Sequence, residues 1–217
     1  MFLLYIYIIN MLVLEEINRI KSLMMINEGK RNNTIPKDNI FNGFKLSEFK
    51  KLTPPENDSD ETKKELEYLD SIDMDKRFVQ EKDNILGNFT DFLESKSISY
   101  DEKLLNDIKS DSVDVIQTLK NHFKRPRPFK LNDKFKDPSM ESTRGYAYPS
   151  GHSTQSNLLC LVLTKFYPKY EKDFKKIVKD IVYSRQMAKA HYPSDIKMGK
   201  KLAKSMFDYL NDEELIH

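Results

Sequence analysis

The chain has 217 residues, enough for one domain with a sizeable core. Its 36 Lys and Arg residues nearly balance its 34 Asp and Glu residues, so the net charge of +2 gives no indication of a polyanionic partner. Cys160 is the only cysteine, which excludes an internal disulfide and a multi-cysteine metal site. Within the apolar run LLCLVL, Cys160 is interpreted as a small buried hydrophobe rather than a nucleophile.

The first fourteen residues, MFLLYIYIINMLVL, are nearly all apolar. A helix needs about 20 such residues to cross a bilayer, so the stretch is short for a spanning segment. No Lys or Arg precedes it, and two glutamates follow it in place of a small-residue cleavage site, which disfavours a cleaved export signal. Three interpretations stay open: a packed or membrane-touching helix, an uncleaved signal or anchor, and a start assigned too early. Localisation stays open with them, although an intracellular soluble protein is favoured, and membrane contact is expected only through residues 1–14.

Helical spacing of apolar residues continues over residues 14–28, and Gly29 suits the end of that helix. The pattern is weak between residues 41 and 52, and the segment PPENDSDET then interrupts the chain. We therefore divide the chain into an N-terminal helical or apolar segment, residues 1–52, and a core domain, residues 53–217. The N-terminal segment is expected to pack on the core or to precede it.

Six helices are predicted in the second part of the chain. Their markers are Leu66, Leu69 and Ile72 after a cap at Ser59 or Asp60; Ile85 to Leu93, with Gly87 as an interruption; Ile116, Leu119 and Phe123, ended by Pro126 and Pro128; residues 152–163; residues 171–190; and residues 194–210, with Ser194 as a cap. A loop of roughly twenty residues precedes the fourth helix, and its length favours a functional role. No stretch alternates in the manner of a strand, so the predicted fold is all-α, a single-domain helical bundle.

Arg185 is the next residue on the apolar stripe of the fifth helix. A guanidinium there costs on the order of several kcal/mol unless an anion or a carboxylate meets it. A structural ion pair is one interpretation. His191 follows six residues later and Asp195 four residues after that, so a cation, an imidazole and a carboxylate lie close together in the sequence. This grouping indicates a functional site instead. A carboxylate that holds one ring nitrogen of a histidine leaves the other nitrogen free to attack or to take a proton.

Two further clusters lie at the ends of the long loop: Lys120 and Arg127 in KNHFKRPRP, and the run YPSGHS. Taken singly, the cations are compatible with solvated charges, and the run is compatible with an ordinary helix start. Ser150 and Gly151 stand where that helix begins, and a helix N-terminus offers unpaired N–H groups to an oxyanion.

Together the three clusters predict a phosphate site. Lys120, Arg127 and Arg185 supply fixed cations. With the charge neutralised, His191 is positioned by the pattern to attack phosphorus while Asp195 holds its other nitrogen, and His152 gives a proton to the departing oxygen. Hydrolysis of the phosphohistidine would then close the cycle.

The same residues resemble the three-part signature of the type 2 phosphatidic acid phosphatase superfamily. The motifs are K-x6-RP at Lys120, Arg127 and Pro128, PSGH at 149–152, and SR-x5-H-x3-D at Ser184, Arg185, His191 and Asp195. RPF, YPSGH and HYPSD are most similar to the soluble class A non-specific acid phosphatases of bacteria, and the resemblance covers roughly residues 53–210.

The resemblance implies an all-helical core of the acid phosphatase and vanadium haloperoxidase type, which hydrolyses phosphomonoesters through a phosphohistidine without a metal. His152 would be the general acid, His191 the nucleophile and Asp195 its orienting carboxylate. The implied phosphate ligands are Lys120, Arg127, Ser150, Gly151 and Arg185. No cofactor is expected, vanadate is expected as an inhibitor, and the expected partner is a small phosphorylated substrate. Lys189 stands where relatives usually have glycine, so substrate preference is expected to differ.

Three alternatives remain. A vanadium-dependent haloperoxidase and a lipid or diphosphate phosphatase would share the signature, although the several spans of a membrane lipid phosphatase are missing. A nucleic-acid-binding module would use residues 120–136, which hold seven Lys or Arg, one acid, and three interleaved phenylalanines. Because the cations of that stretch fall at signature positions, no nucleic acid is expected. The sequence leaves the oligomeric state and the substrate open.

Overall fold

The structure is a computed structural model that describes residues 35–216. Over this range the secondary structure is helical and contains no strand, which confirms the predicted all-α fold. The predictions for residues 1–28, including membrane contact through residues 1–14, lie outside the described residues. The division of the chain into residues 1–52 and 53–217 stays a prediction.

The described helices follow one another with short connections, except for the long loop between α6 and α7. They are α2 (Asp60–Asp70), α3 (Lys76–Glu81), α4 (Ile85–Ser95), α5 (Glu102–Phe123), α6 (Pro128–Leu131), α7 (Gly151–Phe166), α8 (Glu171–Met187) and α9 (Pro193–Asp212), with 3₁₀ turns η1 (Phe49–Lys51), η2 (Glu141–Thr143) and η3 (Pro168–Tyr170). All six predicted helices are present. Gly87 lies inside α4 without ending it, and Ser59 is the N-cap of α2 as expected.

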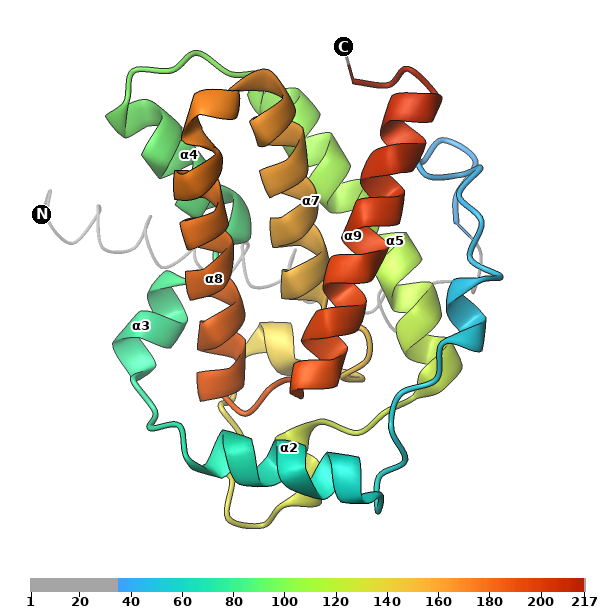
Figure 1. The fold of residues 1–217 in the computed structure, drawn as a ribbon, viewed down its shortest axis with the longest axis vertical. Coiled ribbons are helices and arrows are strands. Elements are labelled where there is room, and N and C mark those ends of the chain that lie inside the picture. Colours follow the sequence, from blue (N-terminus) through green and yellow to red (C-terminus); the bar gives the residue numbers. More distant parts are fainter. Residues whose placement is uncertain (1–34, 217) are drawn as a thin grey trace, which may run out of the picture. The chain divides into compact units, whose positions relative to one another are not determined.

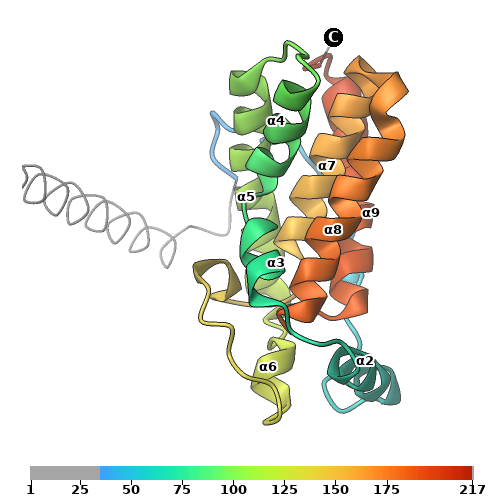
Figure 2. The same ribbon diagram turned by 90° about the vertical axis from the view of Figure 1, so that its left-hand side faces the viewer.

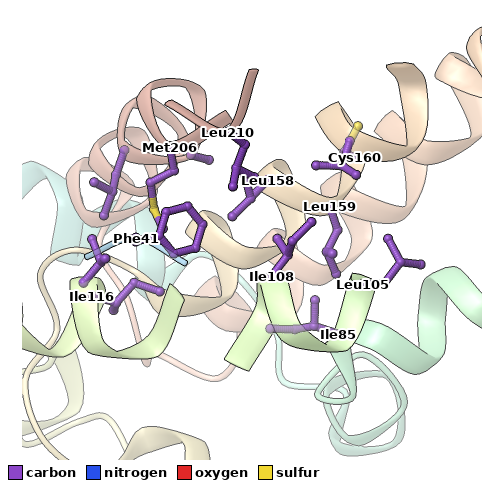
Figure 3. Packing of buried hydrophobic residues seen from close by; sticks show 14 of the residues in the cluster. Phe41, Ile85, Leu105, Ile108, Ile116, Leu158, Leu159, Cys160, Met206 and Leu210 are labelled. Carbon is purple, nitrogen blue, oxygen red and sulfur yellow. The ribbon is translucent and has the colours of Figure 1, made fainter. Parts of the chain in front are cut away.

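Helix α7 is the central element of the bundle. It packs against α5, α8 and α9, which run alongside it (Figures 1 and 2). This position explains its sequence, since α7 is apolar on most sides and buries Leu158, Leu159, Val162 and Leu163. Cys160 lies in the same core and is 6% exposed, so its interpretation as a buried hydrophobe is confirmed (Figure 3). Burial also raises the pKa of its thiol.

The segment before α2 belongs to the same core although its sequence shows no clear periodicity. Phe41, Phe44 and Phe49 are buried, and the ring of Phe44 meets that of Tyr209 edge-on at 5.8 Å between centroids. Turns and η1 carry these rings, so their spacing follows neither a helix nor a strand. Apolar residues in irregular backbone give no periodic signal, which is why the sequence pattern is weak here.

Two helix ends differ from the prediction. Helix α8 ends at Met187 rather than at residue 190, because Lys189 has a left-handed backbone with φ of 53°. Helix α9 begins at Pro193 with Tyr192 as its N-cap, so the expected cap at Ser194 is wrong. The Asp195 carboxylate instead accepts the backbone N–H of Tyr192 at 2.9 Å, which satisfies a donor at the helix start.

Between residues 35 and 216, no helix combines the length and the hydropathy needed to cross a bilayer. The same part of the chain contains no group of three or more His, Cys, Asp or Glu side chains arranged to hold a metal ion. The groups gathered near the start of α9 are instead arginine and histidine side chains with the carboxylate of Asp195.

Candidate active site

The connection between α8 and α9 places His191 beside Asp195. The His191 Nδ1 atom lies 3.4 Å from the Asp195 Oδ2 atom, and the two residues are 2% and 0% exposed. Asp195 is fixed because it stands in the first turn of α9 and also accepts the Tyr192 N–H. Since a carboxylate accepts hydrogen bonds, Nδ1 carries the hydrogen, and Nε2 keeps a lone pair that points away from the carboxylate.

The Nε2 atom of His191 faces the guanidinium of Arg127 and accepts from it. The Nε2 atom lies 3.2 Å from the Arg127 Nη1 atom, which also donates to the Ala190 carbonyl at 2.9 Å. Arg127 comes from the start of α6, 64 residues away, and it is 1% exposed. The structure therefore brings the predicted cluster of Lys120 and Arg127 together with the predicted cluster of Arg185, His191 and Asp195.

The long loop between α6 and α7 covers the cations Lys120 and Arg127. Lys120, on the last turn of α5, donates to the Tyr146 carbonyl. Arg127 donates to the carbonyls of Ser142, Arg144 and Gly145 at 3.3, 3.1 and 3.2 Å. Carbonyl oxygens of the loop thus occupy donors that the sequence assigns to phosphate.

The start of α7 is tied to the start of α9. Ser150 is the N-cap of α7, its hydroxyl accepts the Ser153 N–H at 3.3 Å, and its own N–H donates to the Asp195 carbonyl at 3.0 Å. The backbone N–H groups of Gly151 and His152 lie in the first turn, before the intrahelical ladder begins. The predicted cluster in the run YPSGHS therefore stands at a helix N-terminus, next to the pair of His191 and Asp195.

Gly199 permits this contact between α7 and α9. A β-carbon at residue 199 would lie 2.7 Å from the Ser150 carbonyl oxygen and 2.9 Å from the Ser153 β-carbon. We expect Gly199→Ala to lower the free energy of unfolding by about 1–3 kcal/mol, because the backbone of the α7 start has to move. Urea denaturation measures the change. Gly43→Ala is the control, since its β-carbon would meet only the end of the Tyr209 side chain. Equal stability of the two variants would contradict the prediction.

Arg185 and His152 meet at a carboxylate that the sequence analysis did not identify. Arg185 Nη1 donates to the Asp83 Oδ1 atom at 2.5 Å, and His152 Nε2 lies 2.9 Å from the same oxygen. The remaining Arg185 groups donate to the Val79 carbonyl at 2.9 Å and to the Ser184 hydroxyl at 3.0 Å. The guanidinium on the apolar stripe of α8 thus has the carboxylate partner that its burial requires.

Arg125 is a second residue that the sequence analysis missed. It is 2% exposed, and its Nη1 atom donates to the Asp195 Oδ1 atom at 2.7 Å. Its Nη2 atom donates to the Glu65 Oε2 atom at 3.1 Å, and its guanidinium stacks 3.8 Å from the centre of the Tyr192 ring. Arg125 therefore connects Glu65 and Asp195, and through Asp195 it connects to His191.

Helix α2 holds this arrangement from outside the bundle. Glu65 of α2 accepts the Ser194 N–H at 2.6 Å and the Ser194 hydroxyl at 2.9 Å, so it binds the N-terminus of α9. Helix α2 lies across the end of the bundle where α8 leads into α9 (Figures 1 and 2). Lys189 reinforces the contact, because its ammonium donates to the Leu69 and Ile72 carbonyls at the end of α2.

Burial shapes the charges of the site. Burial, and then the charges of Arg127 and Lys120, lower the pKa of His191 well below its usual range, so its imidazole is neutral near pH 7. Burial raises the pKa of Asp195 to about 6 although Arg125 opposes the shift. Burial lowers the pKa of Arg127 to about 10. A neutral imidazole beside buried cations is suited to attack an anionic electrophile.

Three of the seven cations between residues 120 and 136 are inside the fold. Lys120, Arg125 and Arg127 are 7%, 2% and 1% exposed. A nucleic-acid backbone needs cations on a surface, so these side chains do not form such a surface. The expectation that nucleic acid is not a partner stays a prediction.

Comparison with known proteins agrees with the signature. Residues 112–204 match the family model of the PAP2 superfamily, and this range includes all eight predicted site residues. A non-specific acid phosphatase of Salmonella typhi is 32% identical over 100 residues, which cover 45% of this chain and 40% of that protein. A non-specific acid phosphatase of Salmonella typhimurium (strain LT2) is 33% identical over 86 residues, which cover 38% of this chain and 34% of that protein. The matches thus cover less than half the length of these relatives. The predicted resemblance is confirmed, since residues 112–204 are similar to the PAP2 superfamily and parts of the chain are similar to two non-specific acid phosphatases.

Proposed function

We propose that the protein is a phosphatase, a phosphomonoester hydrolase of the acid phosphatase kind, which acts through a phosphohistidine intermediate and needs no metal. The observation that supports this most directly is the orientation of His191. Its Nδ1 atom faces the Asp195 carboxylate at 3.4 Å, and the lone pair of its Nε2 atom faces the Arg127 guanidinium at 3.2 Å. A lone pair directed toward a buried cation is directed toward the place where that cation would bind an oxyanion.

In the first step the phosphoryl group of the substrate binds Arg127, Arg185, Lys120 and the N–H groups at the start of α7. Because loop carbonyls occupy Arg127, the segment of residues 142–145 has to give up those contacts. His191 Nε2 then forms a bond to phosphorus as the bond to the leaving oxygen breaks. His152 gives its proton to that oxygen, and the alcohol departs.

In the second step water hydrolyses the phosphohistidine. His152, now neutral, takes a proton from the water as the water oxygen bonds to phosphorus and the bond to His191 Nε2 breaks. Asp195 stabilises the positive charge that His191 carries while phosphorylated, because its carboxylate stays against Nδ1. Inorganic phosphate leaves and both histidines return to their first state. The expected substrate is a small phosphorylated molecule.

This function is tested by phosphate release from a panel of phosphate esters, with and without EDTA. We expect hydrolysis that EDTA leaves unchanged, and competitive inhibition by vanadate and phosphate, since both resemble the anion that the cations would hold. Arg127→Ala should weaken vanadate inhibition at least tenfold through the loss of about 1.5–3 kcal/mol of charged hydrogen bonding. Lys130→Ala, which removes an exposed cation three residues away, is the control.

Two results would reject the proposal. One is activity that EDTA abolishes and a divalent ion restores. The other is vanadate inhibition that does not depend on Arg127. Bromide-dependent oxidation of a dye in the presence of vanadate and peroxide, without ester hydrolysis, would favour the haloperoxidase alternative.

A further inference from the structure

Asp83 brings three groups of the site to one oxygen atom. Its Oδ1 atom accepts from Arg185 Nη1 at 2.5 Å and from the Ser142 hydroxyl at 2.8 Å, and it lies 2.9 Å from His152 Nε2. The carboxylate thus contacts the proposed general acid, a proposed phosphate ligand and the loop that covers the site. Asp83 precedes the range that matches the PAP2 superfamily, and no motif includes it.

The backbone around Asp83 is fixed by the start of α4. Asn84 is the N-cap of α4, and its side chain accepts the Gly87 N–H at 3.1 Å. The Asp83 N–H donates to the Gln80 carbonyl at 3.2 Å, so the connection from α3 also holds it. Asn88 adds a third restraint through its hydrogen bond to the Glu81 carbonyl at 3.2 Å. The carboxylate is therefore presented to the site by ordered backbone.

The contact determines which nitrogen of His152 is available. Since a carboxylate accepts, the His152 Nε2 atom carries a hydrogen toward Asp83, and Nδ1 is the nitrogen that exchanges a proton. His191 is held in a related way, by Asp195, but through its other nitrogen. Each histidine of the site thus has a carboxylate of its own, and each carboxylate is also paired with an arginine.

We propose that Asp83 is a positioning residue of the reaction, which orients His152 to deliver its proton to the leaving oxygen and holds Arg185 against the phosphoryl group. The proposal rests on the proposed phosphatase function and deepens it. A carboxylate behind an imidazole favours the protonated form that an acid needs, and it restricts rotation of the ring.

The charges around His152 agree with this role. Burial and the nearby Arg185 of α8 lower the pKa of His152, while the hydrogen bond and the charge of Asp83 oppose this shift. For Asp83 itself, burial alone would raise the pKa, but the hydrogen bond from His152 and the charge of Arg185 lower it to about 2. Asp83 is therefore ionised wherever the enzyme would act.

Asp83→Asn keeps the shape of the side chain and removes its charge. We expect kcat for an alkyl phosphate to fall about tenfold to hundredfold, because a poor leaving group requires the proton, and kcat for p-nitrophenyl phosphate to fall much less. In the pH profile of kcat, the basic limb should move to lower pH. Without Asp83 the pKa of His152 falls, so this general acid loses its proton at a lower pH. The inhibition constant of vanadate should rise, because Arg185 loses the charged partner that holds it in place. Asp91→Asn, an exposed carboxylate on α4, is the control.

Three results would overturn the proposal. Equal losses for both esters, with no shift of the basic limb, would mean that Asp83 is only structural. A gain in kcat/KM for both esters with tighter phosphate binding would mean that Asp83 competes with substrate for Arg185. In the wild-type protein, a nitrogen–proton NMR correlation that shows neutral His152 protonated on Nδ1 would contradict the contact itself. Failure of the wild type to release phosphate from any ester would instead reject the proposed function.

Discussion

His191→Ala should abolish turnover and the covalent intermediate together. Among the described residues, His191 is the histidine whose lone pair, on Nε2, faces the Arg127 guanidinium at 3.2 Å. His152 is assigned the other role, in which its Nε2 atom is held by Asp83 at 2.9 Å and its Nδ1 atom gives the proton to the leaving oxygen. Loss of a nucleophile commonly removes most of the rate enhancement, so we expect kcat to fall by about 10⁴-fold or more.

The measurement is acid-quench trapping of a phosphorylated histidine from labelled substrate, together with the turnover rate. His152→Ala gives the contrast, because it keeps the nucleophile: the label should still form from an ester with an acidic phenol as leaving group. His122→Ala changes an exposed histidine at the end of α5 and is the control. Label that persists in His191→Ala, or label that maps to His152, would reverse the assignment of the two histidines.

The proposed catalytic and phosphate-binding residues could be predicted from the sequence because they lie close together along the chain. His191 and Asp195 are four residues apart on one helix start, and Ser150 and Gly151 are adjacent at another. Such pairs are placed by a single turn of backbone. Arg185 was visible for a different reason, since a charge that interrupts an apolar stripe has to find a partner.

Asp83, Glu65 and Arg125, which hold these residues in place, could not be predicted from the sequence. Their contacts join distant parts of the chain. Asp83 contacts residues 69 and 102 positions away, and Glu65 contacts residues 60 and 129 positions away. Both stand in charge-rich segments where a single carboxylate gives no signal. Arg125 was hidden among seven cations, and only its burial distinguishes it from the exposed Lys124 and Lys130.

Lys189 shows how local reasoning about one side chain can be incomplete. Because Lys189 stands where relatives usually have glycine, two residues before the proposed nucleophile, it was expected to change substrate preference. In the structure its ammonium binds carbonyls at the end of α2 and lies 5.6 Å from the Phe135 ring. The left-handed backbone of Lys189, with φ of 53°, suits glycine and ends α8 early. An effect of Lys189 on substrate preference stays a prediction.

Arg125→Met should be the most destabilising change, because it leaves two buried carboxylates without their cation. Arg125 is 2% exposed and bridges Glu65 at 3.1 Å and Asp195 at 2.7 Å. Removal of one partner from a buried ion pair commonly costs about 3–5 kcal/mol. Arg125→Lys keeps the charge but loses the planar fork, so it should retain part of the stability.

The loss of stability should depend on pH, and its sign follows from Asp195. Burial raises the pKa of Asp195 to about 6, above the value of about 3.9 in the unfolded chain, and loss of Arg125 would raise it further. A carboxyl whose pKa is raised on folding destabilises the protein at high pH and regains a proton as the pH falls. The deficit of Arg125→Met relative to the wild type should therefore be larger at pH 8 than at pH 5. It should shrink as the pH falls through the raised pKa of Asp195 in the variant, and it should level off near pH 6, where the wild-type carboxyl also takes up a proton.

Urea denaturation between pH 5 and pH 8 measures this dependence. Activity adds a readout that a purely structural role would not move: the acid limb of kcat/KM should shift to higher pH, because Asp195 has to be ionised to hold His191 Nδ1. Arg77→Met is the matched control, since Arg77 pairs with Glu81 on the surface. A deficit that is equal at pH 5 and pH 8, with an unshifted acid limb, would mean that Arg125 does not set the charge of Asp195.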